Sequence, residues 1–174
     1  MNSTIRLIAV TLIILGGGYV GYFLASAFSI RIKQIDQLKS VLTQMNFNIG
    51  FLKMTVADAM DEASKISNGV IKKIFSYAAS LIREKGIPPY TAMERGFLKF
   101  RDDLCLLHED REIVMEFAKN LGTGDSVSEE NNIKAAVAKL TLAREDAEER
   151  LKRKGKLWKG LGFLGGMLLS VILF

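Results

Sequence analysis

The stretch that decides the fold is residues 7–30, LIAVTLIILGGGYVGYFLASAFSI, which contains no charged side chain. As a helix it is long enough to cross a bilayer, which takes about 20 residues. A second apolar stretch, GLGFLGGMLLSVILF, covers residues 160–174. We therefore expect an N-terminal transmembrane helix within residues 1–30, a domain over residues 31–159, and a C-terminal transmembrane helix over residues 160–174.

Each apolar stretch has an alternative interpretation. The first one could be a secretory signal, because Arg6 precedes it and Ala25-Ser26-Ala27 resembles a cleavage site, but it exceeds the usual signal core of about 7–15 residues. A retained anchor is therefore favoured. The second would span only about 22 Å of a hydrocarbon core of about 30 Å. A helix that crosses the membrane incompletely is therefore the alternative interpretation of this stretch.

Both apolar stretches contain glycines at the G-x-x-x-G spacing, which places small residues on one helix face and allows close helix packing. The four glycines are Gly17, Gly21, Gly162 and Gly166. The hypothesis is that the two segments pack as an antiparallel pair through these residues. Glycine is also common in membrane helices for no specific reason.

The domain between the apolar ends shows a helical period and no convincing period of two, so we predict an all-α antiparallel bundle without strands. Apolar residues continue in step from the first apolar stretch to about Phe51. Thr55 and Thr91 are predicted to cap the next helix starts, and Gly86 with Pro88-Pro89 to end a helix. Further helices are expected over residues 56–66, 70–84 and 109–121, and a last one from Ser126 into the terminal apolar run.

Basic residues are concentrated next to the second apolar stretch. Residues 150–159, RLKRKGKLWK, hold six basic side chains and no acid, whereas residues 31–149 hold 17 basic against 19 acidic ones. Basic flanks favour the cytoplasmic side, so the domain should be cytoplasmic and lie against the lipid surface. A nucleic-acid footprint would be spread over a face, so no nucleic-acid partner is expected. The predicted membrane-interface residues are Arg31, Lys33, Lys152, Arg153, Lys154, Lys156, Trp158 and Lys159.

Acidic residues gather around one predicted helix junction. They are Asp102, Asp103, Glu109, Asp110, Glu112 and Glu116. A solvated face is one explanation of this cluster, and a docking surface for a basic partner protein is the other. Paired catalytic carboxylates are disfavoured because nothing in the sequence marks a cleft.

Signatures of catalysis are weak throughout. Gly160, Gly162 and Gly165 match G-x-G-x-x-G, but no strand precedes them, so helix packing explains them better than nucleotide binding. Cys105 and His108 are the single cysteine and histidine, which is too few ligands for a zinc site. We expect no enzyme activity, no cofactor and no metal.

The whole pattern resembles the stage III sporulation protein AB family of endospore-forming bacteria. The resemblance depends on the two-anchor layout, the helix starts at Thr55-V-A-D-Ala59 and Thr91-A-M-E, and Leu121-Gly122-T-G-Asp125 before a long charged helix. Its most specific part is the ending, Leu161-Gly162-Phe163-Leu164-Gly165-Gly166 followed by aliphatic residues.

That family looks like a shortened relative of the inner-membrane platform proteins of type II secretion and type IV pilus machines. The resemblance implies a six-helix F-domain bundle in a trans-envelope channel between mother cell and forespore, in the mother-cell membrane. It implies as partners a secretion-type ATPase, stage III sporulation protein AA, and other membrane and ring-forming channel proteins. The alternatives are a platform protein outside sporulation and a membrane-tethered lipid-binding regulator.

Overall fold

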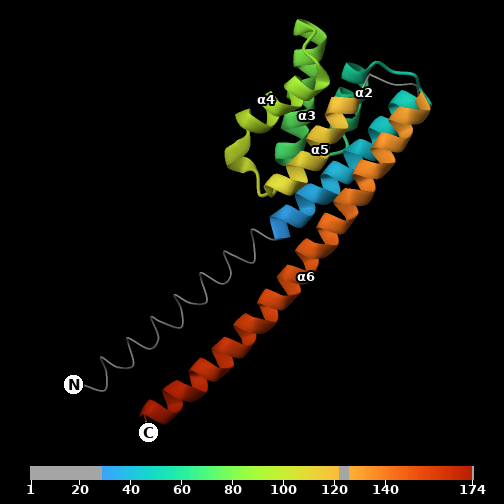
Figure 1. Ribbon diagram of the computed structural model, residues 1–174. Coiled ribbons are helices and arrows are strands. Elements are labelled where there is room, and N and C mark those ends of the chain that lie inside the picture. Colours follow the sequence, from blue (N-terminus) through green and yellow to red (C-terminus); the bar gives the residue numbers. More distant parts are fainter. Residues whose placement is uncertain (1–28, 122–125, 174) are drawn as a thin grey trace. The chain divides into compact units, whose positions relative to one another are not determined.

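The computed structural model describes residues 29–121 and 126–173, with side chains described over 29–121 and 130–153. All regular structure within these ranges is helical, which confirms the predicted all-α class (Figure 1). The elements are a helix over residues 29–50, α2 (Val56–Ser64), α3 (Gly69–Lys85), α4 (Pro89–Lys99), the 3₁₀ turn η1 (Arg101–Asp103), α5 (His108–Asn120) and α6 (Ser126–Leu173). The chain forms two compact units, one of which, here called the body, is Arg31–Glu145, while the other includes Asp146–Phe174.

Local sequence signals set most of the helix ends in the body. The Thr55 side chain accepts a hydrogen bond from the backbone N–H of Asp58 at 3.2 Å and so caps α2 as predicted. Gly86 ends α3 in the left-handed region at φ 61°, and its N–H donates to the carbonyl of Ile82. A glycine suits this position because it has no Cβ to strain there.

The predicted cap at Thr91 is wrong. Helix α4 begins two residues earlier, at Pro89, so Thr91 lies inside its first turn. The physical reason is that proline is well suited to the first helical position, where its fixed φ is already helical and its missing N–H would have no partner anyway. The two prolines therefore end α3 and start α4 within a few residues.

The core of the body is built on one stripe of the helix over residues 29–50. Ile35, Leu38, Leu42 and Met45 are completely buried, at the three- and four-residue spacing of one helix face. Ile74, Phe75, Phe117 and Leu140 of α3, α5 and α6 join the same hydrophobic cluster. The long stripe is thus covered by helices from the whole length of the body.

Gly96 allows α3 and α4 to approach closely. A Cβ at this position would lie 3.1 Å from Cγ2 and 3.3 Å from the carbonyl oxygen of Ile74, which is tighter than ordinary packing. Glycine here therefore serves the contact between two helices rather than a turn.

Helix 29–50 and α6 run side by side in the body (Figure 1). Nε of Arg144 donates to both carboxylate oxygens of Asp36, at 2.9 and 3.1 Å. Because α6 leaves the body just beyond Arg144, this pair fastens the two helices near the end where both of them join the rest of the chain.

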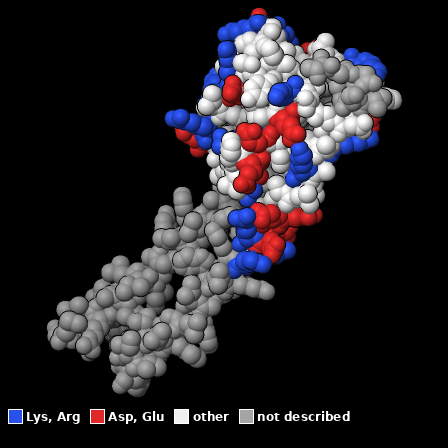
Figure 2. Space-filling model, in the orientation of Figure 1, with Lys and Arg blue, Asp and Glu red and all other residues white. Residues whose placement is uncertain are grey.

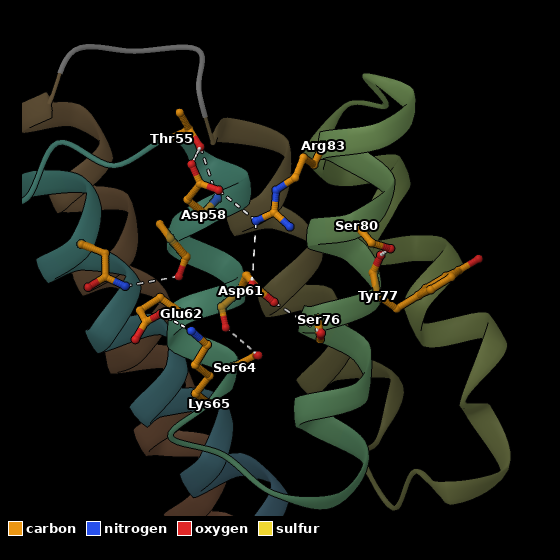
Figure 3. A network of polar contacts seen from close by, with 12 residues as sticks. Thr55, Asp58, Asp61, Glu62, Ser64, Lys65, Ser76, Tyr77, Ser80 and Arg83 are labelled. Atoms are coloured by element: carbon orange, nitrogen blue, oxygen red, sulfur yellow. Dashed lines mark hydrogen bonds and ion pairs between the residues drawn. The ribbon is translucent and has the colours of Figure 1, made fainter.

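A network of polar side chains joins α2 to α3 (Figure 3). The Arg83 guanidinium donates to Asp58 at 2.9 Å and lies 3.8 Å from Asp61. The Thr55 hydroxyl donates to the Asp58 carboxylate at 2.7 Å. The Thr55 hydrogen bond, followed by that of Arg83, holds the pKa of Asp58 below its usual value, and Asp58 in turn raises the pKa of Arg83.

Among the described residues, no helix combines the length and the apolar character that a membrane span requires. Gly17 and Gly21 lie outside the described residues. Residues 160–173 form the end of α6, but their side chains, including those next to Gly162 and Gly166, are also outside the described set. The two transmembrane segments and their packing stay predictions.

Candidate partner-docking surface

The structure places the six residues of the predicted acidic cluster on η1 and α5. Five of them, Asp102, Asp103, Glu109, Glu112 and Glu116, are exposed. The exception is Asp110, which is 0% exposed and has its carboxylate inside the body. Asp110 therefore cannot contact a partner protein, and we remove it from the docking set.

Asp110 pairs with Arg31 from the first turn of the helix over residues 29–50. Nε of Arg31 donates to Oδ2 at 2.8 Å and Nη2 donates to Oδ1 at 2.9 Å, which is the two-pronged geometry that guanidinium and carboxylate prefer. Oδ2 also accepts from the backbone N–H of Leu107 at 2.8 Å, which caps α5. Arg31 is 3% exposed, so it is an interior residue and is also removed from the predicted membrane-interface set.

Gln34 holds the same segment one turn further along the helix. Its Nε2 donates to the carbonyl of Asp103 at 3.1 Å, and its Oε1 accepts from the backbone N–H of Cys105 at 2.9 Å. Gln34 itself is 5% exposed, and both of its bonds are part-buried. We call Arg31, Gln34 and Asp110 the clamp, because together they fix residues 103–110 on the start of the first helix.

The clamp was missed in the sequence, although a signal for it exists. Arg31 precedes Ile35 and Leu38 in the spacing of the buried stripe, and Asp110 precedes Val114 and Phe117 in the same way. A charged residue in register with an apolar stripe is buried if a partner of opposite charge is available. The sequence does not reveal that each of these two residues is the partner of the other.

Four of the five exposed acidic residues, Asp102, Asp103, Glu112 and Glu116, have basic neighbours. Asp103 lies 3.3 Å from Lys73, and Asp102 lies 3.5 Å from Arg101. On α5, Glu112 lies 3.8 Å from His108 and Glu116 lies 2.5 Å from Lys139. Figure 2 shows acidic side chains gathered on one face of the body with lysine or arginine beside them. Exposed pairs of this kind contribute about 0–1 kcal/mol each, so the acidic residues can exchange their basic neighbours for another basic group at little cost in stability. We call the five exposed residues the acidic surface.

The basic residues that precede the terminal apolar run are paired along α6 where they are described. Lys152 lies 2.9 Å from Glu148, Arg153 lies 3.1 Å from Glu149, and Arg150 pairs with Asp146 at 2.8 Å. In each pair the acid lies four residues before the base, which is the favourable order on a helix. Lys33 is exposed, whereas the side chains of Lys154, Lys156, Trp158 and Lys159 lie outside the described residues.

No catalytic constellation appears in the part of the chain with described side chains. No group of three or more His, Cys, Asp or Glu residues could hold a metal there. Cys105 is half-buried, and the side chain of His108 is 76% exposed with Glu112 as its acidic neighbour. What the described surface offers is charge and apolar area for contact with another macromolecule.

The helices and the clamp that joins them define the class of this protein as an all-helical bundle. Residues 6–174 match the family model of stage III sporulation protein AB, so the chain belongs to this family. This confirms the resemblance seen in the sequence. The family is a family of sporulation proteins and is not a known enzyme class.

Two relatives agree with the family assignment. Stage III sporulation protein AB of Bacillus subtilis (strain 168) is 27% identical over 169 residues, which cover 97% of this chain and 99% of that protein. A solved structure of stage III sporulation protein AB superimposes with a TM-score of 0.65 at 25% identity, over 71% of this chain and 97% of that one.

Proposed function

We propose that this protein is a non-catalytic membrane scaffold of the sporulation trans-envelope channel between mother cell and forespore. In this role its body is an F-domain-like bundle on the cytoplasmic side of the mother-cell membrane. It couples a cytoplasmic ATPase related to stage III sporulation protein AA to the membrane and ring-forming components of the channel. Family membership and the apolar sequence at both ends support this proposal.

The clamp is the observation that carries the mechanism. A scaffold that couples a motor to a membrane component must transmit position without deforming. The acidic surface lies on η1 and α5, and the clamp fixes that segment to the first turn of the helix that follows the first apolar stretch. A push on the acidic surface therefore reaches this helix through the buried Arg31–Asp110 hydrogen bonds, which are costly to break in a low dielectric, and through the part-buried bonds of Gln34.

The acidic surface is the proposed contact for the ATPase. The ion pairs that its carboxylates make with described residues all have exposed partners, so a basic partner surface can replace those contacts without disturbing the core. Contact residues on a charged rim mainly set the association rate and the partner choice. The acidic surface would thus select and orient the motor.

Charge reversal tests the proposal. The triple change Asp102→Lys, Glu109→Lys and Glu112→Lys should weaken binding of the purified stage III sporulation protein AA-like ATPase by about tenfold or more, because like charges are then opposed. The control is Glu84→Lys with Glu94→Lys, two exposed acids on other helices of the body. Binding of the full-length protein in detergent is measured by biolayer interferometry. Unchanged binding in the triple variant would refute this contact.

A further inference from the structure

The turn after the first helix presents an unusual amount of apolar surface. Phe47, Phe51 and Leu52 are 49%, 76% and 50% exposed. The two phenyl rings stack with their centroids 5.3 Å apart and their planes at 17°. We call residues 47–54 the tip. Contiguous exposed apolar groups of this kind mark contact sites, and aromatic residues dominate the energy of such contacts.

The tip borders an open hollow of about 490 Å³. It is lined by Thr43, Asn46, Phe47, Gly50, Phe51, Lys53 and Glu130. A second hollow of about 370 Å³ shares Thr43 and Asn46 and continues between the first helix and α6 along Ile133 and Val137. A cavity of about 150 Å³ is enough to admit a benzene molecule, so the larger hollow has room for a phenyl ring.

Buried hydrogen bonds hold the tip in one conformation. Asn48 is 1% exposed, and its Nδ2 donates to the carbonyl of Ala59 in α2 at 3.3 Å, while its Oδ1 accepts from Gln44 at 3.0 Å. Its backbone carbonyl accepts from the N–H of Met54 at 3.0 Å. The aromatic pair is therefore presented on an ordered turn, and little conformational freedom remains to be lost on association.

Lys53 is in a strained backbone conformation, at φ 53°. A residue with a side chain is disfavoured there by about 1–2 kcal/mol, and such strain is concentrated at functional positions. A glycine would remove the strain but would also remove the charge. Among the described residues, none of the ion pairs found involves Lys53, whereas Glu130 across the hollow pairs with Lys134 at 2.6 Å.

The tip combines a projecting aromatic ring with a hollow beside it. Phe51 projects as the most exposed aromatic group among the described side chains, the hollow beside it can receive such a group, and the rim bears a cation at Lys53 and an anion at Glu130. A surface with a projection, a matching recess and both signs of charge is self-complementary, as a two-fold contact between identical chains requires. We propose that two copies of this chain associate through their tips, with Phe51 of each copy in the hollow of the other.

This pairing goes beyond the scaffold role, which does not depend on it. It implies that each scaffold position is occupied by two bodies, with Lys53 of one copy facing Glu130 of the other. Both helices that border the hollow are core elements of the body, so pairing needs no rearrangement of the fold.

Mixed crosslinking tests the arrangement. Two differently tagged full-length proteins, both carrying Cys105→Ala, are co-expressed in membranes, one with Lys53→Cys and the other with Glu130→Cys. A short bismaleimide should join the two tags, because each new cysteine faces the other across copies. The control replaces Glu130→Cys with Leu142→Cys, an exposed position on α6 outside the hollow, and should give no mixed product.

Two further variants change the two parts of the proposed contact, the projecting ring and the hollow that receives it. Phe51→Ala removes the projection, and Gly50→Leu fills the hollow, where an added Cβ meets nothing within 4 Å. Each should raise the dimer dissociation constant of the full-length protein in detergent, measured by analytical ultracentrifugation, by about 30-fold. Leu142→Ala, which removes a similarly exposed apolar side chain, should leave it unchanged.

The outcomes separate cleanly. Mixed crosslinking that is lost with Phe51→Ala and with Gly50→Leu supports the proposal. A protein that stays monomeric at every concentration and gives no mixed product overturns it, and the tip would then be left for a different protein. A dimer that both variants leave intact overturns it as well, because the contact then lies elsewhere. None of these results bears on ATPase binding at the acidic surface, which Asp102 and Glu109 test separately.

Discussion

At the scale of single residues, Arg31 and Asp110 form an ion pair in the interior of the body. Each is almost completely buried and each neutralises the other. Removing one partner leaves an uncompensated charge in the interior, whereas replacing both with apolar groups of similar volume removes that cost.

Asp110→Asn should therefore destabilise the protein by about 3–5 kcal/mol, because the buried Arg31 charge loses the carboxylate that neutralises it. The double variant Arg31→Met with Asp110→Leu should recover most of this loss. Urea unfolding of the full-length protein in detergent, followed by circular dichroism, measures both. The matched control is Lys73→Ala, which breaks an exposed pair with Asp103 and should cost no more than about 1 kcal/mol. A single variant as stable as the wild type would contradict the role assigned to the clamp.

A second prediction at this scale compares Gly96 and Gly50, because a Cβ added at Gly96 would meet Ile74 whereas one added at Gly50 would meet no atom within 4 Å. Gly96→Ala should destabilise the protein by about 1–3 kcal/mol, because the new Cβ presses on Ile74. Gly50→Ala meets open space and should be neutral or stabilise by up to about 1 kcal/mol through helix propensity. Thermal unfolding midpoints of the two variants compare them directly. Equal shifts of the two unfolding midpoints would show that the close approach of α3 and α4 does not contribute to stability.

At the scale of elements, the α2–α3 pair is joined by Arg83, Asp58 and Asp61 (Figure 3). The folded pKa of Asp58 is lowered, so its contribution to stability is fully present above the unfolded value of about 3.9 and is lost as pH falls through the lower folded value. Near neutral pH, small changes of pH should leave this contact intact.

The pH dependence of unfolding tests this assignment. Between pH 7 and pH 5 the contribution of Asp58 should be constant, and below about pH 4 it should decline. Asp58→Asn should lower stability at pH 7 and reduce the difference between pH 7 and pH 3. Glu62→Gln is the control, because its pair with Lys65, the C-cap residue of α2, joins no second helix. An identical pH profile for Asp58→Asn and the wild type would exclude Asp58 as the titrating group.

At the scale of the whole molecule, the proposed role needs the protein to be held in the membrane by its apolar ends. Full-length protein should stay with the membrane fraction in high salt and at alkaline pH and be released by detergent. Ile14→Arg should reduce this retention, since a cation near the middle of a membrane helix costs about 2.5–3.5 kcal/mol. Leu142→Arg, at an exposed position of the body, should not. Fractionation with immunoblotting measures both, and release of the wild type by salt alone would contradict an anchored protein.

The sequence by itself determined the helical class, most helix ends and the family. These follow from short-range physics: the 3.6-residue period, the cap at Thr55, the stop at Gly86 and the break at Pro88-Pro89 each involve neighbours along the chain. A local error was the start of α4, where the preference of proline for the first helical position outweighed the threonine cap.

Only the tertiary structure decided which polar residues are interior and which apolar ones are exposed. Arg31 and Asp110 are 79 positions apart, and Gln34 meets Cys105 across a similar distance, so no local pattern could pair them. Phe51 lies at the predicted end of the first helix, and the helix ends at residue 50 with the Phe51 side chain 76% exposed. Burial is a property of the packed chain, because it depends on which distant elements cover a residue, and periodicity reports only the face on which that residue lies.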